Sequence, residues 1–200
     1  TYSYVCIDQA AWNSENEFEK IQYYFNRYAN FLPADNSSDI KEDVVTFSKW
    51  KYANIGITKQ GVALFASSAD INNFTILPEE FETVYFYTYI LNLYKKIYLK
   101  KLEVEFNNNQ NLKETRKKFI EFTKNLWIQE VTESEVGSNI NFKLSKVFEL
   151  DRLYYEIKTK YDILYKNLNI EKYTKSTVAI AVILIILLIF NILNYIKMIK

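Results

Sequence analysis

An uncharged segment near the C-terminus constrains this chain more than any other feature. Ser176–Ile196 is a run of 21 residues without a charged side chain, and most of them are isoleucine, leucine or valine. A helix of this length is about 30 Å long, which matches the hydrocarbon thickness of a bilayer. We therefore predict a transmembrane helix here, in preference to the core helix of a soluble domain.

A single span is predicted, because the next most apolar segment is too short to cross a bilayer. That segment, Val84–Tyr94, contains Asn92 and is followed at once by Lys95 and Lys96.

Lysines on the two sides of the span predict its orientation. Lys166, Lys172 and Lys175 precede it, and Lys197 and Lys200 follow it. Positive charge collects on the cytoplasmic side, so this small excess places the N-terminal body in the cytoplasm of a single-pass protein of the cell membrane. A chain with one cysteine suits a reducing compartment.

Missing residue types exclude several kinds of active site. The 200 residues include no histidine and one cysteine, Cys6, which excludes histidine catalysis, Cys/His zinc sites and internal disulfides. Gly56 and Gly61 have the spacing of a phosphate-binding loop, but Val62-Ala63 follows where that loop needs Lys-Ser/Thr. We predict no enzyme, no cofactor and no metal site. A formal net charge of +1 argues against duplex nucleic acid as a partner.

The remaining pattern predicts an α+β fold with a small N-terminal α/β body, long helices, a stalk helix and the C-terminal membrane helix. In the body, a capping box at Ser14–Glu17 predicts a helix from Glu15, and Pro33 ends it. Residues rich in β-formers predict strands at 2–7, 44–47, 52–58 and 62–67, the last two joined as a hairpin.

Three long helices are expected after the body, at 78–106, 112–133 and 141–170. The third is the stalk helix, and it can continue into the span. Its apolar stripe suits either an oligomeric bundle or packing against 112–133 within the same chain. The predicted domains are 1–75 for the body, 78–170 for the helices and stalk, and 176–196 for the span.

Two kinds of charged cluster are candidate binding sites. Lys113, Arg116, Lys117 and Lys118 form a basic cluster that suits a ligand or a lipid headgroup, although such clusters are more often solvated faces. Carboxylates gather at Glu79, Glu80 and Glu82 and again at Glu130, Glu133 and Glu135. They can bind cations through oxygen, but helix starts attract acidic residues in any case.

Several blocks resemble bacterial membrane proteins of CorA-like type. These are Trp50–Thr58 with its Gly-Ile-Thr, Phe81–Tyr85, 91–106, and Glu130–Thr132 with Gly137. The order of an α/β body, long helices, a stalk and a membrane segment is similar to CorA transporters. The resemblance implies an oligomeric funnel with an axial pore, and some divergent members act in antiviral defence. CorA transporters have two spans and a Gly-Met-Asn signature, whereas this chain shows one span and lacks that signature.

Two functions follow as expectations. The first is a homo-oligomeric membrane channel or pore-type effector with a cytosolic regulatory domain, which a small ligand would control. The alternative is a membrane-tethered scaffold or sensor that conducts nothing and docks a soluble protein partner. In both, the lipid bilayer is a partner.

One face of the span is the candidate pore lining. Residues at helical spacing share that face, and asparagine is costly against lipid, so the polar members should face protein or water. The face consists of Ser176, Ile180, Ile183, Leu187, Asn191 and Asn194. In a pore, Ile183 and Leu187 would form a constriction that gates by dewetting. Otherwise both asparagines lie at the headgroup boundary beside Tyr195 and Lys197.

Overall fold

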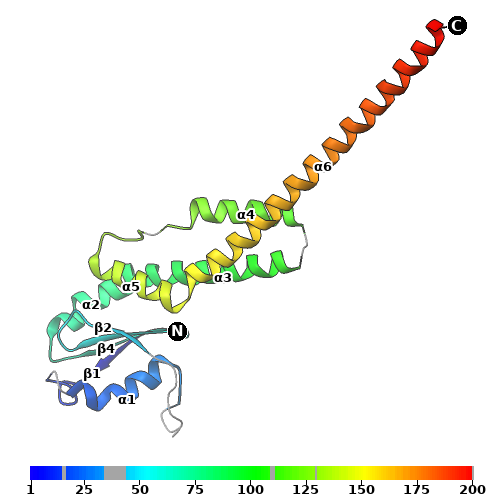
Figure 1. Cartoon of the computed structure of the whole chain (residues 1–200). Helices are drawn as coiled ribbons and strands as arrows, with labels where there is room; N and C mark the ends of the chain where they lie inside the picture. Colours follow the sequence, from blue (N-terminus) through cyan, green and yellow to red (C-terminus); the bar gives the residue numbers. More distant parts are fainter. Residues whose placement is uncertain (15–16, 34–43, 109–110, 129, 200) are drawn as a thin grey trace. The chain divides into compact units, whose positions relative to one another are not determined.

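The computed structural model describes residues 1–14, 17–33, 44–108, 111–128 and 130–199, with the side chains of Leu168 and 193–199 excepted. Two units are distinguished, Thr1–Tyr155 and Glu156–Lys200. The first unit contains the predicted body, 1–75, and the helices that follow it, and from here on the whole unit is called the body. It holds a small sheet with helices on it, and a long helix runs from Leu150 to Ile199 (Figure 1). The predicted α+β class is confirmed. The predicted division into three domains stays a prediction.

The sheet of the body has four strands in the order β1-β4-β3-β2. They are β1 (Tyr2–Ile7), β2 (Val45–Phe47), β3 (Ala53–Thr58) and β4 (Gly61–Ser67), close to the predicted ranges. The hairpin of β3 and β4 is antiparallel, with Thr58 opposite Gly61, whereas β1 pairs with β4 in parallel. A parallel neighbour requires a crossover, and the chain between β1 and β4, which includes α1, β2 and β3, supplies it.

The hairpin is the centre of the body because both of its faces are covered. Every residue of β4 is buried, and so are Ile55 and Ile57 of β3. Helix α1 (Phe18–Ala29) packs on one face of β3 and β4, where Phe25 and Trp12 meet Phe65. A Cβ on Gly56 would lie 2.7 Å from the ring of Phe25, so the absence of a side chain lets α1 approach this closely.

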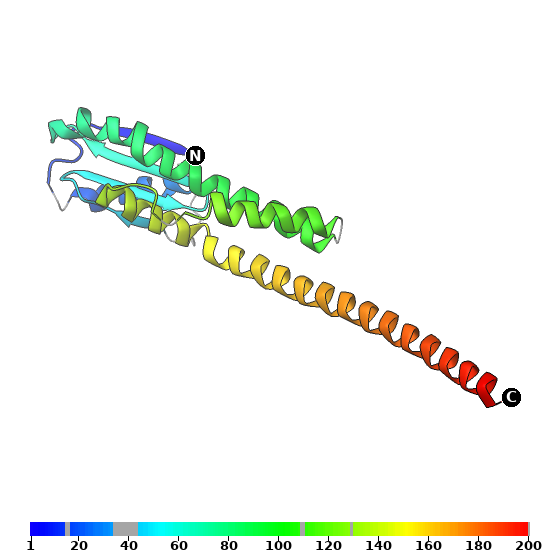
Figure 2. The same cartoon turned by 90° about the horizontal axis from the view of Figure 1, so that it is seen from above.

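Helices also cover the opposite face. The elements there begin with α2 (Ile76–Glu80) and a π-helical turn, η3 (Phe81–Tyr85), which continue as α3 (Phe86–Asn107). Tyr2 of β1 stacks on Phe81 with ring centroids 4.1 Å apart, and α5 (Glu135–Val147) packs on β2 and β3. Helix α4 (Leu112–Asn125) returns antiparallel beside α3 (Figure 2).

The predicted start of the first helix lies among residues that the structure does not describe. Glu15, the predicted start of α1, belongs to the residues that the structure does not describe, and α1 begins at Phe18. The Glu17 carboxylate accepts the backbone N–H of Asn13 at 2.8 Å, so a glutamate at the helix start does satisfy a free donor.

Helix α1 ends at Ala29, before the predicted stop at Pro33. Two later predicted helices also end elsewhere. The helix predicted to reach residue 133 ends at Asn125, because Trp127 leaves it to stack on Tyr154 with centroids 4.2 Å apart. The helix predicted over 141–170 is divided into α5 and α6 (Leu150–Ile199). Glu149 adopts a left-handed conformation, with φ of 56°, between them, and its carboxylate is bound by Arg152 and Lys59. Tertiary contacts override helix propensity at both places.

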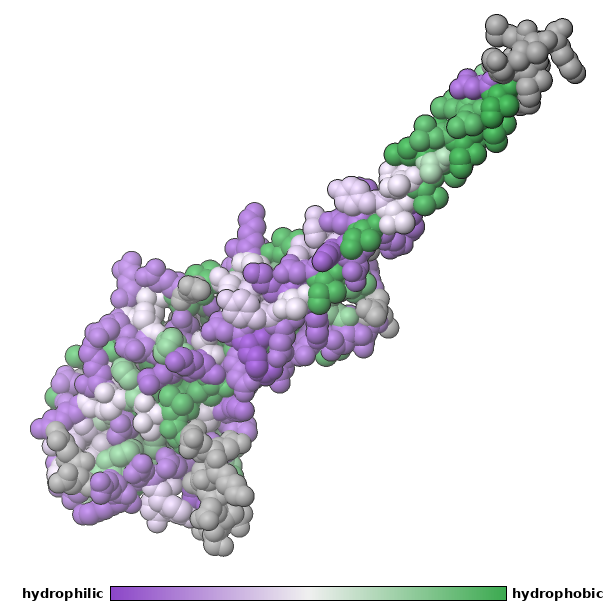
Figure 3. Space-filling model, viewed as in Figure 1, coloured by the Kyte–Doolittle hydropathy of each residue, from purple (hydrophilic) through white to green (hydrophobic). Residues whose placement is uncertain are grey.

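Helix α6 carries the apolar stretch. It is one uninterrupted helix, so the part of the predicted stalk from Leu150 onward belongs to the same element as Ser176–Ile196. Within the described part of the chain, α6 is the one helix long and apolar enough to cross a membrane. Apolar side chains cover the face of residues 178–192 that Figure 3 shows, and they are exposed, with Val178 58% and Leu187 52% exposed.

Candidate functional site

The predicted pore-lining residues lie on α6. Five of them follow one face at helical spacing, and all five side chains are exposed: Ser176, Ile180, Ile183, Leu187 and Asn191. The side chain of the sixth, Asn194, lies outside the description. The structure leaves this face uncovered, and its role in a pore stays a prediction.

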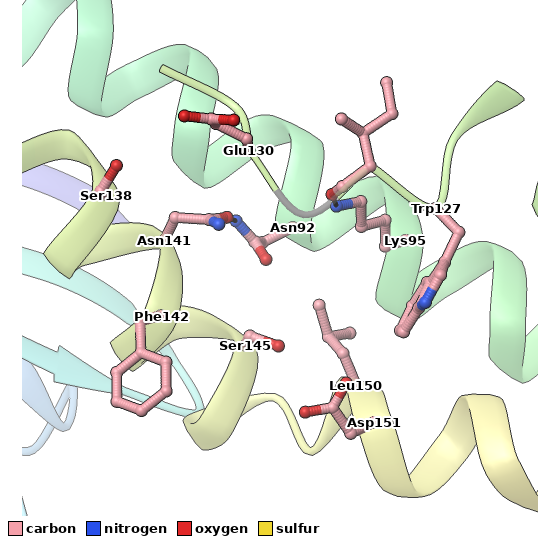
Figure 4. A pocket seen from close by; sticks show the side chains of 11 residues that line it. Asn92, Lys95, Trp127, Glu130, Ser138, Asn141, Phe142, Ser145, Leu150 and Asp151 are labelled. Atoms are coloured by element: carbon pink, nitrogen blue, oxygen red, sulfur yellow. Dashed lines mark hydrogen bonds between the residues drawn. The ribbon is translucent and has the colours of Figure 1, made fainter. Parts of the chain in front are cut away.

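A separate pocket opens in the body between α3, α5, the start of α6 and the segment between α4 and α5. It has a volume of about 470 Å³, in the range of small-molecule sites. Figure 4 shows side chains from these four elements pointing toward one space. The polar and aromatic side chains that line the pocket include Asn92, Lys95, Trp127, Asn141, Ser145 and Asp151.

Lys95 is the most unusual of these residues because it is a lysine with 4% of its surface exposed. Its Nζ donates a hydrogen bond to the backbone oxygen of Ile128 at 2.7 Å and lies 5.8 Å from the centre of the Trp127 ring. Burial lowers the pKa of Lys95, and the charge of Asp151 partly opposes this shift. A charged lysine is therefore kept here at a cost in free energy.

An amide pair links α3 to α5 at the pocket. The Nδ2 of Asn92 donates to the Oδ1 of Asn141 at 2.8 Å and also to the backbone oxygen of Thr88. Helix α5 reaches this position because Ser134 caps its start and Gly137 carries no side chain. A Cβ on Gly137 would lie 2.6 Å from Thr132 and 3.0 Å from Val84. The pocket wall is thus set by close helix packing.

The predicted basic cluster is divided by the structure. Lys113, Arg116 and Lys117 line a shallow hollow of about 450 Å³ on α4, together with Lys124. Lys118 faces another way and forms ion pairs with Glu105 at 3.1 Å and with Glu114. The cluster stays a candidate for a ligand or a lipid headgroup.

The two carboxylate clusters are also dispersed. Glu80 accepts a hydrogen bond from the hydroxyl of Tyr85, Glu135 pairs with Lys49 at 2.9 Å, and Glu130 lines the pocket. Among the described residues, no group of three or more acidic or cysteine side chains is placed to hold a metal ion.

No protein-family model, curated protein or solved structure matches this chain. The resemblance to CorA-type proteins therefore stays a prediction, and the site must be interpreted from its own geometry.

Sequence reasoning missed the pocket. It treated Asn92 and Lys95 as interruptions that made an apolar segment too short to span a membrane. The same two residues are buried, at 1% and 4% exposure, and they form the polar wall of the pocket. A polar residue inside an all-apolar helix was the available signal, because such a helix is buried on every side.

We expect Lys95→Met to change how stability depends on pH. The lowered pKa means that the unfolded chain binds more protons than the folded chain between the folded pKa and the ordinary value of about 10.4. Wild-type stability should therefore gain a rising component as pH increases through that window, and the variant should lack it. Urea unfolding of the full chain in detergent at several alkaline pH values measures this difference.

Lys100→Met, at an exposed position on the same helix, is the matched control. A tyrosine with a raised pKa, such as Tyr89, lowers the stability of the folded chain as pH rises. This contribution is the same in wild type, Lys95→Met and Lys100→Met, so it does not affect their comparison. Parallel pH curves for wild type and Lys95→Met would show that Lys95 is not held in an unfavourable charged state.

Proposed function

We propose that this chain is a single-pass membrane protein in which a small ligand, bound by a cytoplasmic body, controls the membrane helix. One observation carries the proposal. Leu150 and Asp151, in the first turn of α6, line the pocket, and the same helix carries the apolar stretch. A ligand that contacts these residues would act directly on the element that enters the bilayer.

In the membrane, we propose that copies of the helix associate and line a pore. The order of body, long helices, stalk and membrane segment, which resembles that of CorA-type proteins, supports this arrangement. The polar residues on one face also support it. Asn191 is exposed on the helix beside large apolar side chains, and an amide in hydrocarbon is stabilised by a partner helix or by water. Ile183 and Leu187 on the same face would form an apolar constriction, which blocks ions when water leaves it.

Ion flux from proteoliposomes tests the pore. Leu187→Ser should raise the basal leak of potassium by about tenfold or more, because a hydroxyl wets an apolar constriction. Ile185→Ser is the matched control, since it makes a similar change on the opposite face of the helix and should leave the leak unchanged. Asn191→Leu should weaken self-association by about 1 kcal/mol per helix contact, or about fivefold.

The alternative function is a tethered sensor or scaffold that docks a soluble protein. It predicts wild-type behaviour of Leu187→Ser and Asn191→Leu in both the flux and the association measurements. Removal of residues 176–200 separates the two functions further, because a scaffold would still bind its partner whereas a pore would lose its activity. A leak that is equal in Leu187→Ser and Ile185→Ser would also contradict the pore.

A further inference from the structure

Lys95 is a buried cation without an ion pair among the described residues, and the nearest opposite charge that acts on it, Asp151, does so without direct contact. Lysine is almost never buried at this level unless it is paired, because an unpaired charge loses its hydration without compensation. Lys95 forms no ion pair with any residue that the structure describes, and its hydrogen bond to Ile128 uses one of its three N–H groups. Figure 4 shows Lys95 and Asn92 on the same wall of the pocket. The remaining donors are therefore available to an anionic group in the pocket.

Two carboxylates lie at opposite ends of the same pocket. Figure 4 shows Glu130 at one end and Asp151 at the other, with Lys95 and Asn92 on the wall between them. Both acidic residues are exposed, so each can meet a ligand at the rim. A purely anionic ligand would bind Lys95 but be repelled by these carboxylates. A purely cationic ligand would pair with the carboxylates but be repelled by Lys95.

We propose that the pocket binds a small zwitterion, whose anionic group pairs with Lys95 and whose cationic group pairs with Glu130 or Asp151. Such a ligand compensates the buried ammonium and one rim carboxylate at once. Trp127 and Phe142 supply apolar surface for the part of the ligand between its charges. This inference rests on the proposed function in one respect, that the pocket is a ligand site.

Fluorine NMR of the full chain in detergent, labelled with 5-fluorotryptophan, tests the inference. The chain has three tryptophans, and Trp127→Phe assigns the resonance of the one in the pocket. The probes are 4-aminobutyrate and 6-aminohexanoate, compared with butyrate, hexanoate, butylamine and hexylamine. We expect a saturable shift of the Trp127 resonance with one or both amino acids, with Trp12 and Trp50 unmoved.

Variants identify the groups that hold the charges. Lys95→Met should weaken binding of the zwitterion by about tenfold or more, the range for a hydrogen bond to a charged group. Asp151→Asn and Glu130→Gln test the cationic end, and at least one should weaken the same binding. Lys100→Met should bind as wild type does. Three resolved tryptophan resonances show that each variant remains folded.

The outcomes separate this inference from the proposed function. Binding of an acid or an amine as tightly as the amino acid of equal length overturns the zwitterion but keeps a ligand pocket, so the proposed function stands. Unchanged binding in Lys95→Met overturns the role of the buried ammonium. No shift with any probe also overturns the inference, and the potassium-flux experiment, which uses no ligand, then decides the pore separately.

Discussion

A chain carrying both Ile185→Lys and Ile189→Lys is expected to lose stable insertion into membranes. These two residues lie on the face of α6 opposite to the candidate pore lining, so their lysines would meet lipid even in an oligomer. Each substitution costs about 3–4 kcal/mol near the bilayer centre. The pair cancels most of the gain from the large apolar residues of the stretch, which contribute about 0.3–0.6 kcal/mol each.

Alkaline extraction of membranes measures this effect. We expect the double variant to fall to less than about a tenth of the wild-type level in the extracted membrane pellet, consistent with a cost of several kcal/mol. Ile163→Lys, an exposed position on α6 before the uncharged stretch, is the control and should remain in the pellet. Retention of the double variant at the wild-type level would mean that another protein, not lipid, surrounds this helix.

Labelling of the single cysteine in cells shows on which side of the membrane the body lies. Cys6 is exposed on β1, so it can react with a maleimide that does not cross membranes. A cytoplasmic body predicts labelling only after the cells are opened, and Cys6→Ser gives the background. Labelling of intact cells would reverse the proposed orientation.

Asn73→Ala is expected to lower the free energy of unfolding of the body by about 2–3 kcal/mol. Asn73 lies in the short 3₁₀ helix η2 (Ile71–Phe74) and is fully buried. Its Nδ2 lies 3.1 Å from the backbone oxygens of Lys51, Tyr52 and Ser67, at the edge of the β3–β4 hairpin. Loss of the amide removes a donor from all three carbonyls. The carbonyl of Tyr52 keeps a hydrogen bond from Ser67 N–H, and that of Ser67 keeps a long one, 3.5 Å, from Asp70 N–H.

Two further variants test this explanation by urea unfolding of the full chain in detergent, monitored by tryptophan fluorescence. Asn72→Ala removes a neighbouring amide that is exposed and bonded to Asp70, so it should cost less than about 0.5 kcal/mol. Asn73→Asp keeps the volume but turns an oxygen toward the three carbonyls, so it should destabilise at least as much as alanine. Wild-type stability of Asn73→Asp would show that Asn73 acts by packing and not as a donor.

Local patterns were sufficient to predict most elements of the body. The alternation and β-branched content of 2–7, 52–58 and 62–67 predicted strands within a residue or two of their observed ends, and the short turn at Lys59–Gly61 predicted the hairpin. These signals work because backbone propensity and a nearby turn are properties of adjacent residues. Local patterns could not predict the parallel pairing of β1 with β4, since residues separated by a helix and two strands share no local signal.

The sequence by itself determined that the C-terminal segment can form a membrane-spanning helix, because the length and composition of a run of residues are sufficient to show this. It also excluded histidine catalysis and internal disulfides within these 200 residues, because they include no histidine and one cysteine. Only the tertiary structure decided where the long helices end and where the pocket lies. The left-handed turn at Glu149 and the stacking of Trp127 on Tyr154 depend on contacts between segments distant along the chain. Lys95 and Asp151 line one pocket because helix packing brings together residues that spacing along the chain leaves unrelated.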